Sequence, residues 1–91
     1  MPITFDPAKR DATLKARGLD MAGASAIFAG DTLTVEDDRR DYGEARFITI
    51  GFLWKRMVVV VWTSRGPVRR IISLRKANAR EQALYAPRFR Q

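Results

Sequence analysis

An uninterrupted apolar run at residues 57–62, M-V-V-V-V-W, limits most strongly what this chain can fold into. A strand with one solvated face alternates apolar and polar residues, whereas this run has no such alternation. We therefore predict a central strand, Met57 to Thr63, that is covered on both faces. Three neighbouring segments also have the pattern of strands: Thr32–Glu36, Arg46–Trp54 and Val68–Arg75. Short connections join the last strands, a hairpin turn at Lys55–Arg56 and a turn at Ser64–Pro67.

Helix signals stand at both ends of this antiparallel meander. Asp6 before Pro7 predicts a helix to about Arg17 that Gly18 ends, since an aspartate accepts the free N–H groups of the first turn. Similar signals predict a helix at Met21–Ala29 capped by Asp20, and a helix at Ala79–Ala86 capped by Asn78 and stopped by Pro87. The short apolar segment Ile3–Phe5 predicts an edge strand. The predicted order is β-α-α-β-β-β-β-α, an α+β fold with helices packed on a small antiparallel sheet.

At 91 residues the chain should form one domain, residues 1–91. It contains neither cysteine nor histidine, which removes disulfides, thiolate ligands and the commonest general base and metal ligand. We therefore expect no metal and no cofactor. The sequence has no long apolar segment and no secretory leader pattern, so we expect a soluble, cytoplasmic protein without membrane contacts.

The positive charge is concentrated at one end of the chain. Residues 1–64 carry nine basic and nine acidic side chains, whereas residues 65–91 carry eight basic side chains against Glu81 alone, which accounts for the net charge of +7. This asymmetry indicates a polyanion or an acidic protein as the partner. For Arg88 and Arg90, which follow Pro87, a solvated basic tail is the simpler explanation.

The stretch Val68 to Arg80 carries most of these charges around a short apolar core, Ile71, Ile72 and Leu74. A strand with so many cations around an apolar core is best interpreted as one that contacts the phosphates of RNA. Strict alternation places Arg69, Ile71, Ser73 and Arg75 on one face, and Val68, Arg70, Ile72 and Leu74 on the other, which resembles the core side.

Several residues have a structural explanation beside a functional one. Trp54 and Trp62 could stack on bases, but packing is the favoured role for both. Arg39 and Arg40 stand among three aspartates that can neutralise them, and Glu44 and Arg46 can form a local ion pair. Glu81 fits a capping carboxylate as well as a base, and Tyr85, one helical turn later, fits packing as well as an active hydroxyl.

Five segments together resemble the BrnT family of toxins over nearly the whole chain: F-D-P-A-K at 5–9, K-A-R-G at 15–18, E-A-R-F-I-T-I-G at 44–51, V-V-V-V-W-T-S-R-G at 58–66 and R-I-I-S-L-R-K-A at 70–77. The resemblance implies a fold similar to that of RelE-type ribonuclease toxins. It also implies a metal-independent ribonuclease that inhibits translation and growth in a type II toxin–antitoxin pair. The implied partner is a BrnA-like antitoxin with a ribbon-helix-helix part, in a 2:2 complex that contacts operator DNA through the antitoxin.

The expected site residues form two groups, and all of them except Arg17 and Arg80 are carried over position by position from the resemblance. The catalytic group is Arg70, Arg75, Glu44, Glu81 and Tyr85, and the RNA-binding group is Lys9, Arg17, Arg46, Ser73, Lys76 and Arg80. Arginine suits the binding of a phosphorane because its planar fork matches phosphate oxygens. Glu44, Glu81, Tyr85 and a lysine all stay open as the general base. The family usually has K-H-G where this chain has Ala16-Arg17-Gly18, so a catalytically weak homologue that binds the antitoxin or nucleic acid is the alternative function.

Overall fold

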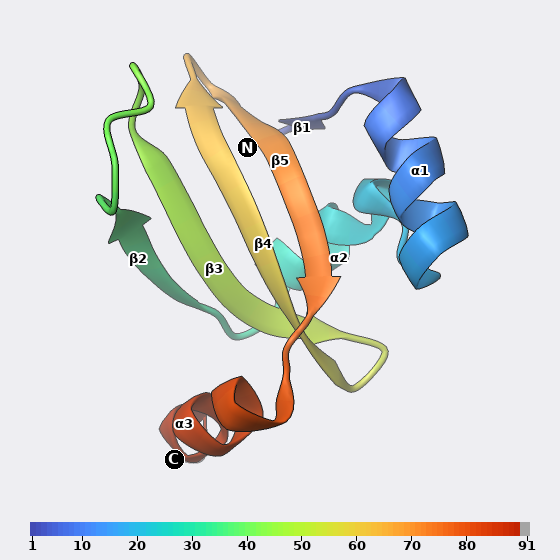
Figure 1. Cartoon of the computed structure of the whole chain (residues 1–91), viewed down its shortest axis with the longest axis vertical. Coiled ribbons are helices and arrows are strands. Elements are labelled where there is room, and N and C mark those ends of the chain that lie inside the picture. The colour runs from blue at the N-terminus through green and yellow to red at the C-terminus, as the bar shows by residue number, and fades with distance from the viewer. Residues whose placement is uncertain (90–91) are drawn as a thin grey trace.

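A five-stranded sheet with the strand order β1-β5-β4-β3-β2 forms the centre of the molecule (Figure 1). The computed structural model describes residues 1–89. Its elements are β1 (Ile3–Thr4), α1 (Pro7–Arg17), the 3₁₀ turn η1 (Met21–Gly23), α2 (Ala24–Ala29), β2 (Leu33–Asp37), β3 (Arg46–Leu53), β4 (Arg56–Arg65), β5 (Val68–Lys76) and α3 (Ala79–Phe89). β1 pairs with β5 in parallel, and the other neighbours are antiparallel. The predicted α+β class and element order are confirmed.

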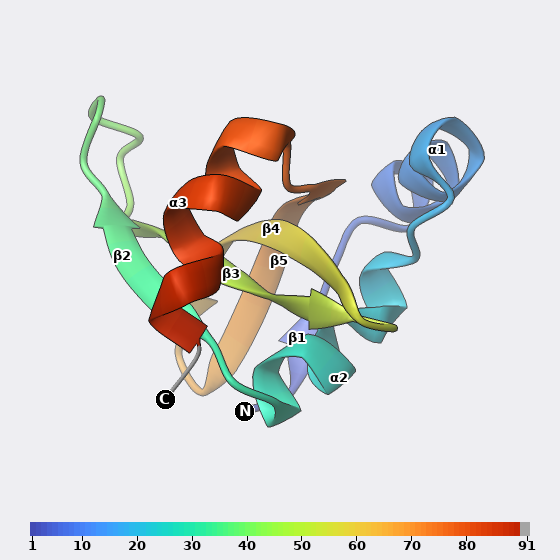
Figure 2. The same ribbon diagram turned by 90° about the horizontal axis from the view of Figure 1, so that it is seen from below.

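Strand β4 is covered on both faces, as the apolar run predicted. One face, which we call the α2 face, packs Val58, Val60 and Trp62 against η1 and α2. The other, the α3 face, packs Met57 and Val59 in a smaller cluster with residues of α3. Figure 2 shows α2 and α3 on opposite sides of the sheet, with α1 beside its β5 end.

Local signals correctly predicted the first helix. The Asp6 carboxylate accepts a hydrogen bond from the Ala8 N–H at 2.9 Å, and Gly18 ends α1 with a φ of 68°. No residue of α1 is buried, in keeping with its thin apolar face. The second helix begins after Asp20 as predicted, but its first turn is the 3₁₀ turn η1.

The β3–β4 hairpin turns one residue earlier than predicted. Leu53 pairs with Arg56, so the two turn residues are Trp54 and Lys55 rather than Lys55 and Arg56. Both have a positive φ, which is the geometry of a type I′ hairpin. Leu53 is buried in the core on the α2 face, and this packing holds the register.

Helix α3 does not stop at Pro87, contrary to the prediction. It continues to Phe89, whose ring packs edge-on against Phe52 with centroids 4.9 Å apart. Proline removes one N–H from the helix, and the packing of Phe89 offsets that loss. Arg88 is therefore helical rather than part of a tail, whereas Arg90 lies outside the described residues.

A β-bulge in β5 overturns the predicted division of its two faces. Ser73 pairs with Val61 and Ile71 pairs with Trp62, so Ile72 is the extra residue. Ile71 and Leu74 consequently lie in the same buried cluster on the α2 face. Arg69 shares the α2 face with Ile71, as predicted, but Leu74 lies there too. Arg70 lies on the α3 face with Ser73 and Arg75, so its predicted grouping with Leu74 on the core side is wrong. Within residues 1–89 there is no helix with the length and hydrophobicity needed to cross a membrane.

Candidate active site

Helix α3 covers only one end of its face of the sheet and leaves the other end open (Figure 1). Residues that pair across neighbouring strands point to the same face, so the register gives the composition of this open end. Next to α3 the cross-strand row is Ile50, Val59 and Arg75, followed by Val35, Ile48, Val61 and Ser73, and then by Asp37, Arg46, Thr63 and Arg70. The α3 face thus changes from an apolar core to a polar row within a few residues.

Asp37 anchors the far end of the polar row. Its buried carboxylate accepts two hydrogen bonds from Arg39, at 2.8 and 2.9 Å, and one from the Tyr42 hydroxyl at 3.1 Å. The Arg39 hydrogen bonds hold the pKa of Asp37 at about 2. The predicted neutralisation of Arg39 is confirmed, whereas Arg40 stacks over the Tyr42 ring at 5.6 Å.

Arg46 is held in place by stacking rather than by hydrogen bonds. Its guanidinium carbon lies 4.1 Å from the centroid of the Tyr42 ring, and its Nε is buried without a hydrogen-bond partner in the described chain. Glu44 stands 3.8 Å from that Nε and 3.6 Å from Arg65, both beyond good hydrogen-bond distance. The predicted Glu44–Arg46 pair is present, but it leaves the donor capacity of Arg46 unused.

A small pocket lies where β3 begins and β4 ends. It has a volume of about 180 Å³ and is lined by four cations, two carboxylates and two isoleucines: Lys9, Arg46, Arg65, Arg70, Asp6, Glu44, Ile71 and Ile72. Arg70 is half-buried and makes no ion pair or side-chain hydrogen bond to any residue in 1–89. A partly desolvated guanidinium without a partner is unfavourable unless an anion binds to it.

Arg75 lies on the same face but already has a carboxylate partner. Its two terminal nitrogens donate to Glu81 at 2.7 and 2.8 Å. Glu81 also accepts from the Asn78 N–H at 2.9 Å, and Asn78 accepts from the Glu81 N–H at 2.8 Å, so the predicted capping box is confirmed. The hydrogen bonds from Arg75 lower the pKa of Glu81 to about 2. The same hydrogen bonds raise the pKa of Arg75, although burial and the positive charge of Arg39 partly oppose this shift.

Arg69, one residue from Arg70, occupies a wholly different environment. Its guanidinium carbon lies 4.0 Å from the Phe28 ring centroid and 5.0 Å from that of Trp62, on the α2 face. Trp62 is buried and donates a hydrogen bond from Nε1 to the Thr49 hydroxyl at 2.8 Å, which confirms its predicted packing role. Arg69 is therefore a structural arginine.

Helix α1 borders the outer edge of β5. β1 pairs only with Arg69 and Arg70, so the carbonyls further along this edge lack a strand partner. Arg17 donates from Nη1 to the Leu74 carbonyl at 2.8 Å, and Lys9 and Ser73 line the groove between α1 and the strand. Arg17 thus fastens α1 to β5.

The structure brings together most of the residues that the sequence singled out. Lys9, Glu44, Arg46 and Arg70 share the small pocket, and Ser73, Arg75 and Glu81 follow along the same face. The other four lie elsewhere: Arg17 at the edge, Lys76 at the end of β5, Arg80 exposed on α3, and Tyr85 half-buried in the cluster beneath α3. The catalytic and RNA-binding roles of all eleven stay predictions.

Three residues of the pocket region were missed by sequence reasoning. Arg65 and Asp6 line the pocket, and Tyr42 supports both Asp37 and Arg46. Arg65 was counted among the unbalanced charges, but only the hairpin register places it beside Glu44. Tyr42, in a turn-rich loop, gave no periodic signal.

A family model for BrnT, the ribonuclease toxin of a type II toxin–antitoxin system, matches residues 5–81. The chain belongs to the BrnT family of ribonuclease toxins. The match covers the chain from α1 to β5, the residues of the pocket and the Arg75–Glu81 pair, and it leaves out β1. As a BrnT-family toxin it has RNA as its target and a protein antitoxin as its partner. A search of curated proteins found no match to this chain.

Proposed function

We propose that this BrnT-family toxin cleaves RNA without a metal ion, by attack of a 2′-hydroxyl on the adjacent phosphate. The observation that carries the proposal is the pair of arginines on either side of Thr63: among the described residues, the guanidinium of Arg46 makes no hydrogen bond and only a long contact with Glu44, and Arg70 has no partner at all. Both line one pocket. Their unused donors suit the oxygens of a phosphodiester.

The reaction breaks the P–O5′ bond as the 2′-oxygen bonds to phosphorus. A general base takes the proton of the 2′-hydroxyl, and the leaving 5′-oxygen takes a proton from the protonated base or from water, which leaves a 2′,3′-cyclic phosphate and a 5′-hydroxyl. The intermediate phosphorane carries more negative charge than the substrate. Fixed cations therefore stabilise the transition state more than the ground state. Arg46 and Arg70 bind the phosphate oxygens in this proposal, and Lys9 adds a third positive charge from α1.

Arg75 acts beside this pair rather than in place of it. The bidentate contact with Glu81 fixes the orientation of its guanidinium, and Nη1 also donates to the Lys76 carbonyl at 3.4 Å. In this proposal the N–H groups outside these contacts face a neighbouring phosphate. Glu81, with a pKa of about 2, is a weak base at neutral pH, so its proposed role is to position Arg75.

Glu44 is the proposed general base. It lines the pocket with Arg46 and Arg70, and its two ion pairs are long, at 3.8 and 3.6 Å. Asp6 also lines the pocket but accepts the Ala8 N–H as a helix cap. Tyr85 packs in the cluster beneath α3, which favours a structural role for its ring.

The proposed partner is a BrnA-like ribbon-helix-helix antitoxin, and the proposed consequences of RNA cleavage are arrested translation and growth. A toxin with a net charge of +7 attracts an acidic segment quickly. Carboxylates that bind Arg46 and Arg70 would occupy the phosphate sites and so block RNA.

The test is incubation of the purified protein with single-stranded RNA in EDTA. Fragments with cyclic-phosphate and 5′-hydroxyl ends support the proposal. Variants Arg70→Ala and Arg75→Ala should lose cleavage and growth inhibition while they stay folded, and Lys15→Ala, which removes an exposed charge of α1, should behave as the parent. Cleavage at the parent rate by a folded Arg70→Ala/Arg75→Ala protein would contradict the assignment.

The alternative function is a toxin homologue without activity that still binds the antitoxin or nucleic acid. It is favoured by one observation: position 17 carries an arginine bonded to the Leu74 carbonyl, and this arginine cannot titrate. Under this alternative the same EDTA experiment gives only salt-sensitive RNA binding. Binding of operator DNA without an antitoxin would point instead to a direct DNA-binding role.

A further inference from the structure

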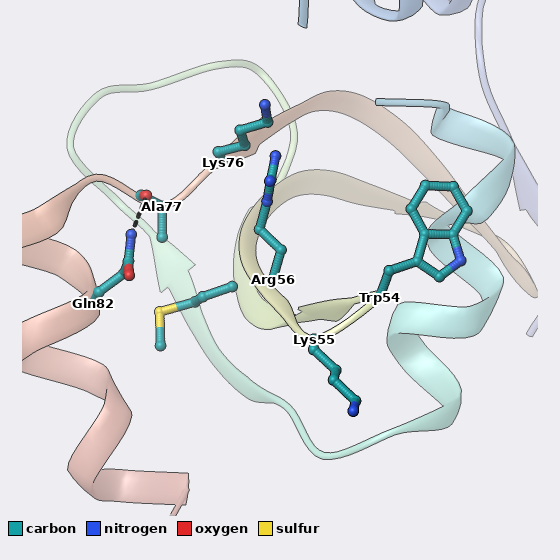
Figure 3. Close-up of a pocket in the computed structure, with 7 residues that line it drawn as sticks. Trp54, Lys55, Arg56, Lys76, Ala77 and Gln82 are labelled. Carbon is teal, nitrogen blue, oxygen red and sulfur yellow. Dashed lines mark hydrogen bonds between the residues drawn. The ribbon is translucent and has the colours of Figure 1, made fainter. Parts of the chain in front are cut away.

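Trp54 stands at the tip of the β3–β4 hairpin with 82% of its surface exposed. It is the most exposed large apolar side chain in residues 1–89, and the packing role that the sequence favoured for it is wrong. Figure 3 shows its indole on one flank of the turn, away from Gln82 and Ala77. A tryptophan in this position adds little to the core.

The turn holds this side chain in an unfavourable backbone conformation. Trp54 has a φ of 51° and Lys55 a φ of 65°, a region that asparagine and glycine occupy far more readily. Strained residues that persist without a packing reason are concentrated at binding sites. The strain alone identifies no ligand, but it shows that a more stable turn sequence is available.

Three cations line a pocket together with Trp54. They are Lys55, Arg56 and Lys76, the pocket has a volume of about 520 Å³, and no carboxylate lines it. None of the three forms an ion pair or side-chain hydrogen bond within the described part of the chain. Arg56 and Lys76 extend from the same side of the strands (Figure 3), because Lys76 pairs with Val58, two residues after Arg56.

We infer that this hairpin tip is a second RNA-binding site, in which Trp54 stacks on an unpaired base while Arg56 and Lys76 bind the flanking phosphates. An exposed aromatic ring beside unpaired cations is the combination that binds single-stranded nucleic acid. An acidic peptide would use the cations but leave the indole without a matching surface. The inference rests on the proposed function, because the RNA that binds at the hairpin tip is the substrate of the proposed cleavage.

The tip lies at one end of β5 and the small pocket at the other. Arg70 and Lys76 are six residues apart, which corresponds to about 20 Å along a strand. Lys76 lies on the α2 face with its partner Val58, whereas Arg70 lies on the α3 face, so an RNA that contacts both sites passes around the edge of the sheet. Only an oligonucleotide of several nucleotides can do so, whereas a dinucleotide reaches one site. The tip should strengthen binding of longer RNA without changing the chemistry at the pocket.

Fluorescence separates the two tryptophans, since Trp62 is buried and Trp54 is exposed. A 2′-O-methyl RNA of about eight nucleotides, which cannot be cleaved, should quench the emission of Trp54 on binding. Trp54→Ala should weaken binding of this RNA about 10-fold or more, and Trp54→Phe, which keeps a ring, should lie within a few-fold of the parent. Loss of both cations in Arg56→Gln/Lys76→Gln should reduce the salt slope of binding by about 1.4.

A second variant protects the test against misfolding. Trp54→Asn/Lys55→Gly installs the preferred type I′ sequence and should raise the melting temperature while it weakens RNA binding as Trp54→Ala does. Unchanged emission with RNA, parent affinity in Trp54→Ala, or equal quenching by polyglutamate would overturn the inference. RNA should still quench the emission of Trp54 in Arg70→Ala. If this variant loses cleavage but keeps the quenching, the lost activity is due to the pocket and not to the hairpin tip.

Discussion

The two faces of the sheet differ in how completely helices cover them. On the α2 face, Val58, Val60, Ile71 and Leu74 are almost completely buried beneath η1 and α2. On the α3 face, the helix covers one end, and beyond it Arg46 and Arg70 line a small pocket. The first face stabilises the fold, and the second has room for a ligand.

The neighbouring residues Arg69 and Arg70 show this difference most directly. Arg69 stacks on Phe28 and Trp62 of the closed face, whereas Arg70 lines the pocket of the open face without a partner in the described chain. Identical side chains one residue apart thus lie in different environments, and only Arg70 has a proposed role in binding. Their separation follows from the alternation of side chains along a strand.

Arg70→Ala should give the largest effect, and it should affect activity alone. Loss of one donor to the phosphorane lowers cleavage on the order of 100-fold, or about 3 kcal/mol in the activation free energy. Stability should change by less than about 0.5 kcal/mol, since Arg70 has no partner to lose. RNA cleavage rates and urea unfolding of the same preparation measure both quantities.

Gly51→Ala should lower the stability of the protein and leave its activity unchanged, the opposite of Arg70→Ala. A methyl group at this position would stand 2.6 Å from Cγ2 of Ile27, within the closed α2 face. Overpacking of this kind destabilises a protein by about 1–3 kcal/mol. Thermal unfolding should show the loss, and cleavage per folded molecule should stay near that of the parent. A stable Gly51→Ala protein would mean that α2 packs less closely than described.

Arg69→Ala is the matched partner of Arg70→Ala. Loss of the stacking on Phe28 and Trp62 should destabilise the protein by about 1–2 kcal/mol. Cleavage below the melting transition should stay within about twofold of the parent, since Arg69 lies on the other side of the sheet. A large loss of activity in the folded variant would break the comparison between the faces.

The Glu81–Arg75 pair should give the smallest effect, a dependence of stability on acidic pH. Because the folded protein lowers the pKa of Glu81 to about 2, this contribution is complete above the ordinary pKa and disappears as pH falls through about 2. Glu81→Gln keeps the capping hydrogen bond but removes the charge, so its stability should fall less steeply below pH of about 4.5. After solvent screening the difference is roughly 1 kcal/mol, measurable by urea unfolding at several pH values. Identical pH profiles would show that the pair does not stabilise the fold.

Local chemistry made much of the fold predictable. Asp6, Pro7 and Gly18 determine α1 through caps that need no distant contact, and Asn78 with Glu81 determines the start of α3 in the same way. The run at 57–62 predicts a strand buried on both faces. Where a distant contact competes with a local signal, prediction failed: Phe89 packs on Phe52 and carries α3 past Pro87.

The candidate site was predictable in its residues but not in its geometry. Charge and resemblance singled out Arg70, Arg75 and Glu81, yet one extra residue in β5, at Ile72, places Arg70 and Arg75 on the same face, which simple alternation does not predict. A bulge depends on how two strands pair, so a single strand's alternation cannot show it. The sequence by itself determined which cations are available and where helices begin. Only the tertiary structure decided which arginine meets aromatic rings, which meets Glu81 and which stays open to a phosphate, because these depend on residues far apart along the chain.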